Sequence, residues 1–281
     1  MTITCVVTSY NNGEYLRDAV GSVLKQTMAV DEIIVADDAS TDGSRELIRA
    51  LAAECARLRP IFRERNLGVA RNRDFATREA AGDFVTWLDG DDFYYDNKIE
   101  LECRAIASRP VGVACSNVDI VDANGELVGY RDVSRFAGMP KEEVLEIFAF
   151  RRGGLPTHMF MPKSIYERVG GLRSKFQIYE DWDFKIRLAA LPVRWVWSGC
   201  VGMAYRQTGT GLASVPVEEH AKAMRLVLAE NEALLTEVLG IDGYRRVMRV
   251  VPPTKSRRRG RKALRSIVRL ARRWLIKEPG I

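Results

Sequence analysis

The sequence lacks several features, and each absence excludes a class of protein. No run of about 18 apolar residues occurs in the chain, so no segment reads as a membrane span. The five cysteines are odd in number and have no CxxC spacing, so we expect reduced thiols of a cytosolic protein rather than disulfides or a zinc site. No G-x-G-x-x-G follows a predicted strand, which excludes a dinucleotide dehydrogenase. The N-terminus has no basic leader, so we expect no signal peptide.

Charge is distributed unevenly along the chain. The net charge is +6 over 281 residues. The segment from Lys255 to Ile281 contains 11 Lys and Arg and one Glu, whereas the rest of the chain contains 32 Lys and Arg and 36 Asp and Glu. The body is therefore mildly acidic and the tail strongly basic, which implies two different partners.

The first 110 residues alternate predicted strands with predicted helices. Buried or β-branched runs predict strands at 3–8, 32–36, 60–62 and 84–88. Helical spacing of apolar residues predicts helices at 15–24, 47–52 and 68–81. This alternation is typical of a mostly parallel α/β sheet with helices on both faces.

Polar or acidic residues follow three of these strands. They are the clusters Ser9–Asn12, Asp37–Asp42 and Asp89–Asp92. Ligands of parallel α/β sheets bind beyond the carboxyl ends of the strands, so we expect the three clusters to converge on one site. Packed carboxylates repel one another, and Mn²⁺ or Mg²⁺, which prefers oxygen ligands, would relieve that repulsion.

The pattern changes after about Pro110. We expect strands at 111–117, 157–161, 193–197 and 201–205, and a hairpin of 118–121 with 127–130 across an Asn-Gly turn. We expect helices at 140–150, 163–169 and, as one long helix, 218–239. Acids at 180–183 lie at the start of a further helix, where the helix dipole favours negative charge.

Several spaced segments together resemble the family 2 glycosyltransferases of GT-A fold. They are Val7–Asn11, Val35–Gly43, Asn66–Asp92 and the acceptor-side segment Glu180–Asp183 with Arg187. The resemblance runs from about residue 3 to residue 205. It implies an inverting transfer of a sugar from a nucleotide diphosphate to an acceptor hydroxyl.

The resemblance implies how the metal would be held. Asp89 and Asp91 match the DxD positions, which would hold a divalent cation, Mn²⁺ or Mg²⁺, on the diphosphate, with one of them also touching the ribose. Asp92 is a third acid, either a closer metal ligand or the cap of the next helix.

The resemblance also implies how the nucleotide would be bound. Asp38 matches a position that meets the nucleoside, and Thr8 and Tyr10 lie at the neighbouring strand end. Arg71 matches a position that reaches the nucleotide, with a surface helix charge as the alternative.

On the acceptor side, Asp181 matches the general base. Glu180 and Asp183 are close enough in sequence to raise its pKa by repulsion, although Asp181 as a mere helix cap is the alternative. His158 matches a stretch that lines the acceptor side in the family, and a structural histidine is its alternative. Many family members carry a metal-side histidine after the strand corresponding to 201–205. None occurs here, and Arg206 with the glycine-rich loop after it could bind the diphosphate or close as a lid instead.

The basic tail has an amphipathic pattern. Its apolar residues Leu264, Ile267, Val268, Ala271, Trp274 and Leu275 fall on one helical face, and arginines occupy the rest. This pattern favours an interfacial helix on an anionic membrane surface. Packing of the helix on the body is the alternative. Nucleic acid is not expected, because no aromatic platform or groove-reading motif accompanies the charges.

These patterns predict the domain organisation. We expect a GT-A glycosyltransferase domain at 1–215, with a nucleotide-sugar-binding half at 1–110 and an acceptor half at 111–215. A helical region at 216–250 and the basic tail at 251–281 would follow.

The predicted function is a metal-dependent inverting glycosyltransferase of cell-surface or secreted glycan synthesis. Its donor would be a UDP-, GDP- or dTDP-linked sugar and its acceptor a glycan or a lipid-linked sugar. We expect it in the cytoplasm, peripheral on the inner face of the cell membrane. A sugar nucleotidyltransferase would need a glycine-rich phosphate loop after the first strand, and Ser9–Gly13 is not one. A catalytically inactive GT-A-like protein that binds nucleotide or glycan is the other alternative, and the intact Asp89, Asp91 and Asp181 argue against it.

Overall fold

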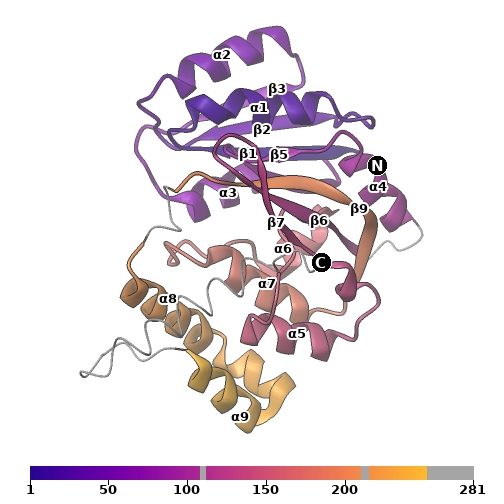
Figure 1. Cartoon of the computed structure of the whole chain (residues 1–281), viewed down its shortest axis with the longest axis vertical. Helices are drawn as coiled ribbons and strands as arrows, with labels where there is room; N and C mark the ends of the chain where they lie inside the picture. Colours follow the sequence, from indigo (N-terminus) through magenta and orange to yellow (C-terminus); the bar gives the residue numbers. More distant parts are fainter. Residues whose placement is uncertain (108–111, 210–214, 252–281) are drawn as a thin grey trace.

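The computed structural model of the chain describes residues 1–107, 112–209 and 215–251 (Figure 1). The predicted α/β fold with a helical C-terminal part is confirmed. The boundary predicted at residue 110 and the basic tail after Val251 lie outside the described residues. Within the described ranges, no helix is long and apolar enough to cross a membrane.

The N-terminal sheet has five strands in the order β3-β2-β1-β4-β8. Its parallel strands are β1 (Ile3–Ser9), β2 (Glu32–Asp37), β3 (Leu58–Phe62) and β4 (Phe84–Asp89), and β8 (Met161–Pro162) joins the edge antiparallel. Its helices are α1 (Gly13–Leu24), α2 (Ser44–Glu54) and α3 (Val69–Arg78).

Alternate residues of β1 enter different cores. Cys5 and Val7 belong to the cluster that contains Leu16 of α1, whereas Val6 packs in the cluster that contains Ala76 of α3. A strand buried on both faces needs apolar side chains on both, which explains the run Cys5–Val7, and the buried Thr4 hydroxyl is satisfied by a hydrogen bond to Glu32.

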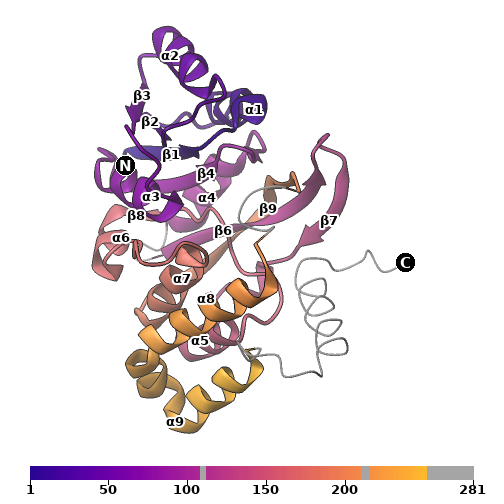
Figure 2. The ribbon, with the colours of Figure 1, turned by 90° about the vertical axis from the view of Figure 1, so that its left-hand side faces the viewer.

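The second sheet has four strands in the order β5-β9-β6-β7. They are β5 (Phe93–Tyr94), β6 (Gly112–Asp122), β7 (Leu127–Arg131) and β9 (Arg194–Gln207). The predicted hairpin is confirmed as β6–β7, which extends away from the body (Figure 2). Only β6 and β9 pair in parallel in this sheet, so the mostly parallel character holds for the first sheet alone.

Two predicted strand breaks are wrong. The strands expected at 193–197 and 201–205 are one strand, β9, because the ladder to β6 passes from Trp197 to Val201 through a register shift. Gly199, at φ +84°, lies within this irregularity and allows the extra residues to bulge. The strands at 111–117 and 118–121 likewise form the single strand β6.

The strand expected at 157–161 is also largely wrong. Its second residue, His158, is left-handed at φ +47°, so only Phe160 bridges to Ala114 before the short β8.

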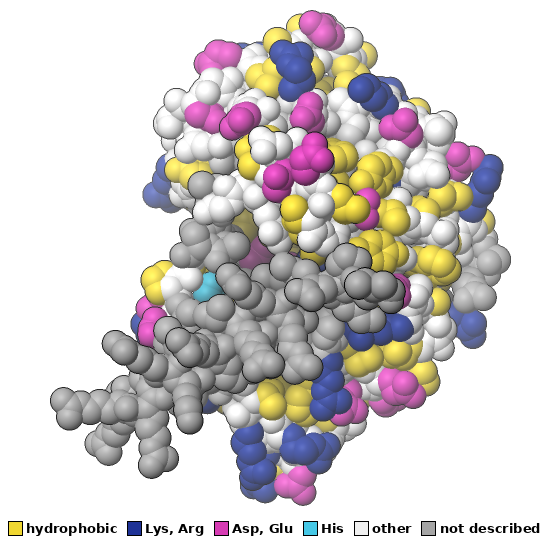
Figure 3. Space-filling view, in the orientation of Figure 1, with side chains coloured by type: hydrophobic (Ala, Val, Ile, Leu, Met, Phe, Trp, Pro, Cys, Tyr) yellow, Lys and Arg dark blue, Asp and Glu magenta, His cyan; other side chains and the backbone are white. Residues whose placement is uncertain are grey.

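The lower half of the molecule as drawn in Figure 1 is helical and contains α5 (Lys141–Phe150), α7 (Glu180–Ala190), α8 (Val217–Glu230) and α9 (Glu232–Val250). Helix α4 (Lys98–Ala107) instead packs against β6 and β9, and α6 (Lys163–Val169) follows β8 directly. The single long helix expected at 218–239 is wrong, because it ends at Glu230 and α9 begins after Asn231. Exposed arginines of α9 contribute to the basic lower end of the surface (Figure 3).

Asp183 holds the helix junction together. Asn231 donates a hydrogen bond of 2.8 Å from Nδ2 to Asp183 Oδ1, and Arg187 donates bonds of 3.0 Å from Nε and 2.7 Å from Nη2 to Oδ2. Asp183 is fully buried, so these partners replace the water that its charge would otherwise need.

We predict that Asp183→Asn lowers the free energy of unfolding by about 3–5 kcal/mol, because it leaves the buried Arg187 without its charge partner. Urea denaturation followed by circular dichroism measures this loss. Asp242→Asn, on the exposed side of α9, is the control and should leave the transition unchanged. Equal midpoints for the two variants would contradict the prediction.

Candidate active site

The carboxyl ends of β1, β2 and β4 meet at one edge of the sheet, as predicted. Thr8 is in register with Asp89, and Ser9 with Asp37. Thr8 Oγ1 donates a hydrogen bond of 2.9 Å to Asp89 Oδ1. The register of parallel strands thus brings side chains distant in sequence into contact.

After the ends of β1 and β2, Tyr10 and Asp38 lie in different environments. Asp38 is buried, and its carboxylate accepts hydrogen bonds from the backbone N–H groups of Leu67 and Gly68 at 2.9 and 2.8 Å. Tyr10 is exposed and its ring is open to solvent. Asp38 therefore fixes the loop that leads into α3.

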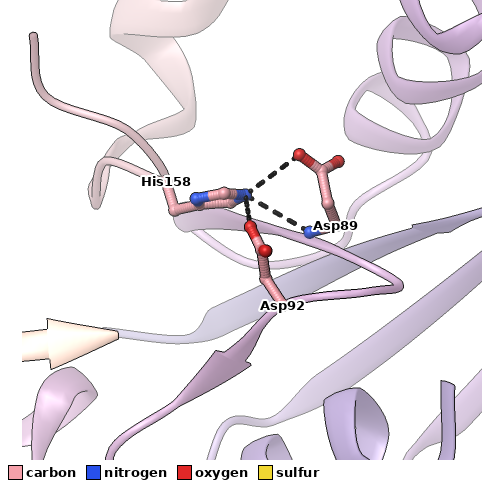
Figure 4. Close-up of side chains that lie close together, drawn as sticks. All are labelled: Asp89, Asp92 and His158. Carbon is pink, nitrogen blue, oxygen red and sulfur yellow. Dashed lines mark hydrogen bonds and ion pairs between the residues drawn. The ribbon is translucent and has the colours of Figure 1, made fainter. Parts of the chain in front are cut away.

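Asp89, Asp92 and His158 form a compact group (Figure 4). His158 Nε2 lies 3.3 Å from Asp89 Oδ2 and 3.7 Å from Asp92 Oδ2, and it accepts a 3.3 Å hydrogen bond from the backbone N–H of Asp89. One ligand atom from each residue lies within 4.8 Å of the others. Asp91 is outside this group, which is the one such group found among the described residues.

The group has the properties of a divalent-cation site. Asp92 Oδ2 and His158 Nδ1 are buried and have no hydrogen-bond partner. Burial raises the pKa of Asp91 to about 6, and the charge on Asp89 adds to this. Burial, then Asp91 and Asp89, raise the pKa of Asp92 well above its usual range. A cation with carboxylate and imidazole ligands would relieve this repulsion, so the residues fit Mn²⁺ or Mg²⁺.

A histidine reaches the two acids from a part of the chain other than the end of β9, namely His158. Its buried ring reaches Asp89 and Asp92 from the segment before β8, so it lies at the acid cluster, whereas we had expected it on the acceptor side. Lys98 Nζ donates a 3.1 Å hydrogen bond to the His158 carbonyl and a 2.5 Å bond to Glu102. This buried pair fixes the left-handed backbone that points the ring at the acids.

Arg206, near the end of β9, contacts the acid cluster, by which we mean Asp89, Asp91 and Asp92. Its backbone N–H donates to Asp92 Oδ1 at 2.8 Å, and its Nε donates to the Asp91 carbonyl at 2.9 Å. Its guanidinium lies over Tyr15, with Cζ 4.6 Å from the ring centre. The glycine-rich loop expected to follow as a lid falls largely in 210–214, outside the described residues.

Arg73 is a site residue that the sequence analysis missed. It is buried, and Nη2 donates to both Asp89 and Thr8, while Nη1 lies 3.8 Å from Glu180 Oε1. Arg71 is exposed, because two residues along a helix turn the side chain to the opposite face. Arg73 lies on the same stripe as the buried Ala70 and Ala76, and that spacing is the signal that could have distinguished the two arginines.

Glu180 and Asp181 begin α7 and have opposite pKa shifts. Burial, followed by the charge on Asp181, raises the pKa of Glu180 to about 7. Burial alone would raise the pKa of Asp181, but Lys185, then Arg151 and Arg73, lower it to about 2. Lys185 Nζ donates a 2.6 Å hydrogen bond to Asp181 Oδ2. The expected rise from repulsion is therefore wrong.

Asp183 does not contribute to this carboxylate pair. Its carboxylate bonds Arg187 and Asn231 in the core instead, which is why it cannot act on Asp181 as we expected.

Residues 4–170 match the family model for glycosyl transferase family 2. The chain belongs to glycosyltransferase family 2. It is 34% identical over 205 residues to an uncharacterized glycosyltransferase of Nostoc sp., covering 72% of this chain and 58% of that one. It is also 31% identical over 127 residues to the Escherichia coli UDP-Glc:alpha-D-GlcNAc-diphosphoundecaprenol beta-1,3-glucosyltransferase WfgD, covering 45% of this chain and 49% of that one. The chain thus spans about half the length of these relatives.

Solved structures agree on the fold. Residues 1–349 of TarS from S. aureus, in complex with UDP-GlcNAc, superpose with a TM-score of 0.66 at 21% identity, covering 82% of this chain and 66% of that one. The same protein in complex with UDP gives a TM-score of 0.63. At this identity the likeness shows the GT-A fold alone.

Proposed function

We propose that this glycosyltransferase moves a sugar from a UDP-linked donor to an acceptor hydroxyl, with inversion and with a divalent cation. The observation that carries the proposal is that one buried guanidinium, Arg73, contacts both Asp89 of the acid cluster and Glu180 of the α7 start. The two halves of a transfer site are thereby held side by side. The UDP and UDP-GlcNAc complexes of TarS and the UDP-Glc named for the E. coli relative support the choice of donor.

The acid cluster would serve the leaving group. Asp89, Asp92 and His158 would hold Mn²⁺ or Mg²⁺, which supplies Lewis-acid stabilisation of the departing diphosphate. Arg73 keeps Asp89 ionised, since it and His158 lower the pKa of Asp89 against the effect of burial. Thr8 fixes the Asp89 carboxylate by a hydrogen bond, so the ligand is oriented before a donor binds.

Asp181 would accept the proton of the acceptor hydroxyl. Its Oδ2 is bonded to Lys185, so Oδ1 is the oxygen available to the substrate. With a pKa of about 2, Asp181 is ionised at any physiological pH but is a weak base. It becomes effective as the attacking oxygen bonds to the sugar carbon, because the hydroxyl proton is then strongly acidic. Glu180, with a pKa of about 7, is the second candidate for this role.

We further propose that the acceptor is a lipid-linked glycan of cell-surface synthesis and that the tail docks the enzyme on the inner face of the cell membrane. The E. coli relative is named for a diphosphoundecaprenol-linked acceptor, and a Bacillus subtilis relative is named as a putative teichuronic acid biosynthesis glycosyltransferase. The net charge of the segment after Lys255 suits an anionic surface.

We predict that Asp92→Asn weakens Mn²⁺-dependent UDP binding at least 10-fold, because it removes a buried carboxylate that has an unpartnered oxygen. Isothermal titration of UDP, with Mn²⁺ and with EDTA, measures this. Asp96→Asn, at an exposed position shortly after the cluster, is the matched control. A UDP affinity that changes neither on removal of Mn²⁺ nor in Asp92→Asn would exclude the proposed metal site.

For the base, we predict that Asp181→Asn lowers kcat roughly 10²–10⁴-fold and leaves UDP affinity unchanged. Transfer is measured with a panel of UDP-sugars and the membrane-extracted acceptor fraction. Glu180→Gln is the matched variant. If Glu180 were the base instead, kcat of the wild type would fall below about pH 7 and Glu180→Gln would carry the larger loss.

For the tail, we predict that the full chain floats with vesicles containing anionic lipid, stays in solution with zwitterionic vesicles, and is released by about 0.5 M salt, since the attraction is electrostatic. A chain ending at Val251 is the control and should not float. Flotation of that shorter chain, or equal binding to both vesicle types, would contradict the role of the tail.

A further inference from the structure

Three cations surround Asp181 on the acceptor side of the site. Lys185 is buried and bonds Asp181 at 2.6 Å. Burial lowers the pKa of Lys185, Asp181 raises it, and Arg131 and Arg151 lower it further. The three positive side chains are therefore close enough to repel one another, and they come from three elements: the end of β7, the end of α5 and α7.

Arg151 has a strained backbone conformation and a side chain that is fixed by stacking. It ends α5 in the left-handed conformation, at φ +49°. Its Cζ lies 4.4 Å from the ring centre of Tyr179 and 5.1 Å from that of Trp182, so the guanidinium is stacked in a fixed position. Its Nη1 is buried and has no hydrogen-bond partner. Strain and an unused donor on the same residue point to a missing acceptor atom.

Arg131 is also positioned without an ion pair among the described residues. A Cβ added at Gly154 would collide with Arg131 Cγ, so the arginine stem lies directly on the glycine backbone. Burial lowers the pKa of Arg131, while Tyr205, Asp92 and Asp181 raise it. Its Cζ lies 5.6 Å from the ring centre of Tyr205. The guanidinium is thus directed toward the site rather than toward an acid of its own.

The local charges do not balance. Asp181 is the carboxylate that Lys185 contacts, whereas Arg73 already faces Asp89 and Glu180. Asp181 alone cannot neutralise Lys185, Arg131 and Arg151. Partly buried positive charge in excess attracts an anion, and guanidinium groups bind phosphate and carboxylate with two parallel hydrogen bonds.

We propose that the acceptor carries an anionic group, a phosphate or a carboxylate, which Arg131, Arg151 and Lys185 bind beside Asp181. The proposal rests on the proposed transferase function, because it assigns these cations to the acceptor. The donor diphosphate is the other group that these cations could bind, since Asp92 is close enough to Arg131 to raise its pKa against the effect of burial. The position of Lys185 on Asp181 and of Arg151 on the residues that start α7 favours the acceptor.

The test titrates the full chain with inorganic phosphate at about 0.3 M NaCl, which screens diffuse binding to the basic tail. We expect millimolar binding that Arg151→Gln and Lys185→Met each weaken about 10-fold. Arg152→Gln, at the exposed neighbouring position, should leave it unchanged. Asp181→Asn should strengthen it several-fold, because it removes the competing carboxylate. The Asp181 variant answers the question even if Arg151→Gln fails to fold.

Matched sugars distinguish the two anion sources. Glucose 1-phosphate and glucuronate are compared with neutral glucose, and the tighter anionic sugar identifies phosphate or carboxylate as the preferred group. Equal binding of all three sugars, no phosphate binding by about 50 mM, or phosphate binding that is insensitive to Arg151→Gln, Lys185→Met and Asp181→Asn would overturn the proposal.

A parallel UDP titration with Mn²⁺ distinguishes failure of the anionic-acceptor proposal from failure of the proposed transferase function. If Arg151→Gln and Lys185→Met weaken UDP as strongly as phosphate, the cations serve the donor and the acceptor assignment is wrong. If the wild type binds phosphate at these cations but no UDP, the transferase proposal fails while the anion site stands. UDP affinity unchanged in both variants supports the acceptor assignment.

Discussion

The site depends on one buried cation, Arg73. Its guanidinium contacts Asp89 at the end of β4 and Glu180 at the start of α7, segments far apart in sequence. A buried arginine stays charged, so each carboxylate gains a positive partner. The end of β4 and the start of α7 are thereby held next to each other. Burial raises the pKa values of Asp91 and Asp92, and the charge of Asp89, which Arg73 and His158 keep ionised, raises them further. The position of this guanidinium thus adds to the repulsion that a bound cation would relieve.

Arginine placement also shows what the sequence could and could not predict. The meeting of three strand ends followed from parallel pairing, which depends only on strand order and direction. Arg71 and Arg73 have nearly the same sequence environment, and resemblance alone selected the exposed one. Helix phase would have selected the buried one, since Ala70 and Ala76 mark the inward face. Periodicity within the chain therefore gave information that motif matching did not use.

Other features could not be predicted, because their causes are not local. The end of α8 is fixed by Asn231, whose side chain donates a hydrogen bond to Asp183 of α7. The residues around the end of α8 do not predict this contact, because Asp183 is distant in sequence. His158 turns toward the acids because the buried Lys98 holds its carbonyl. Pattern reasoning assumed an extended strand there, which would have directed the ring elsewhere. In each case a buried polar contact overrides the local preference of the chain.

The strain in the fold is concentrated at the same place as its unbalanced charge. The described residues other than glycine that have positive φ are Asn11, Ala39, Arg151, His158 and Tyr179. Asn11 and Ala39 follow β1 and β2, and the other three lie near Asp89 and Asp92 or at the start of α7. A left-handed backbone at a residue other than glycine costs about 1–3 kcal/mol of conformational free energy, and it persists only where the surrounding packing enforces it. Burial, then the charge on Asp181, raise the pKa of Glu180 to about 7, whereas Lys185, then Arg151 and Arg73, lower the pKa of Asp181 to about 2 against the effect of burial. The two adjacent acids therefore differ because of their surroundings and not because of the Glu-Asp pair itself.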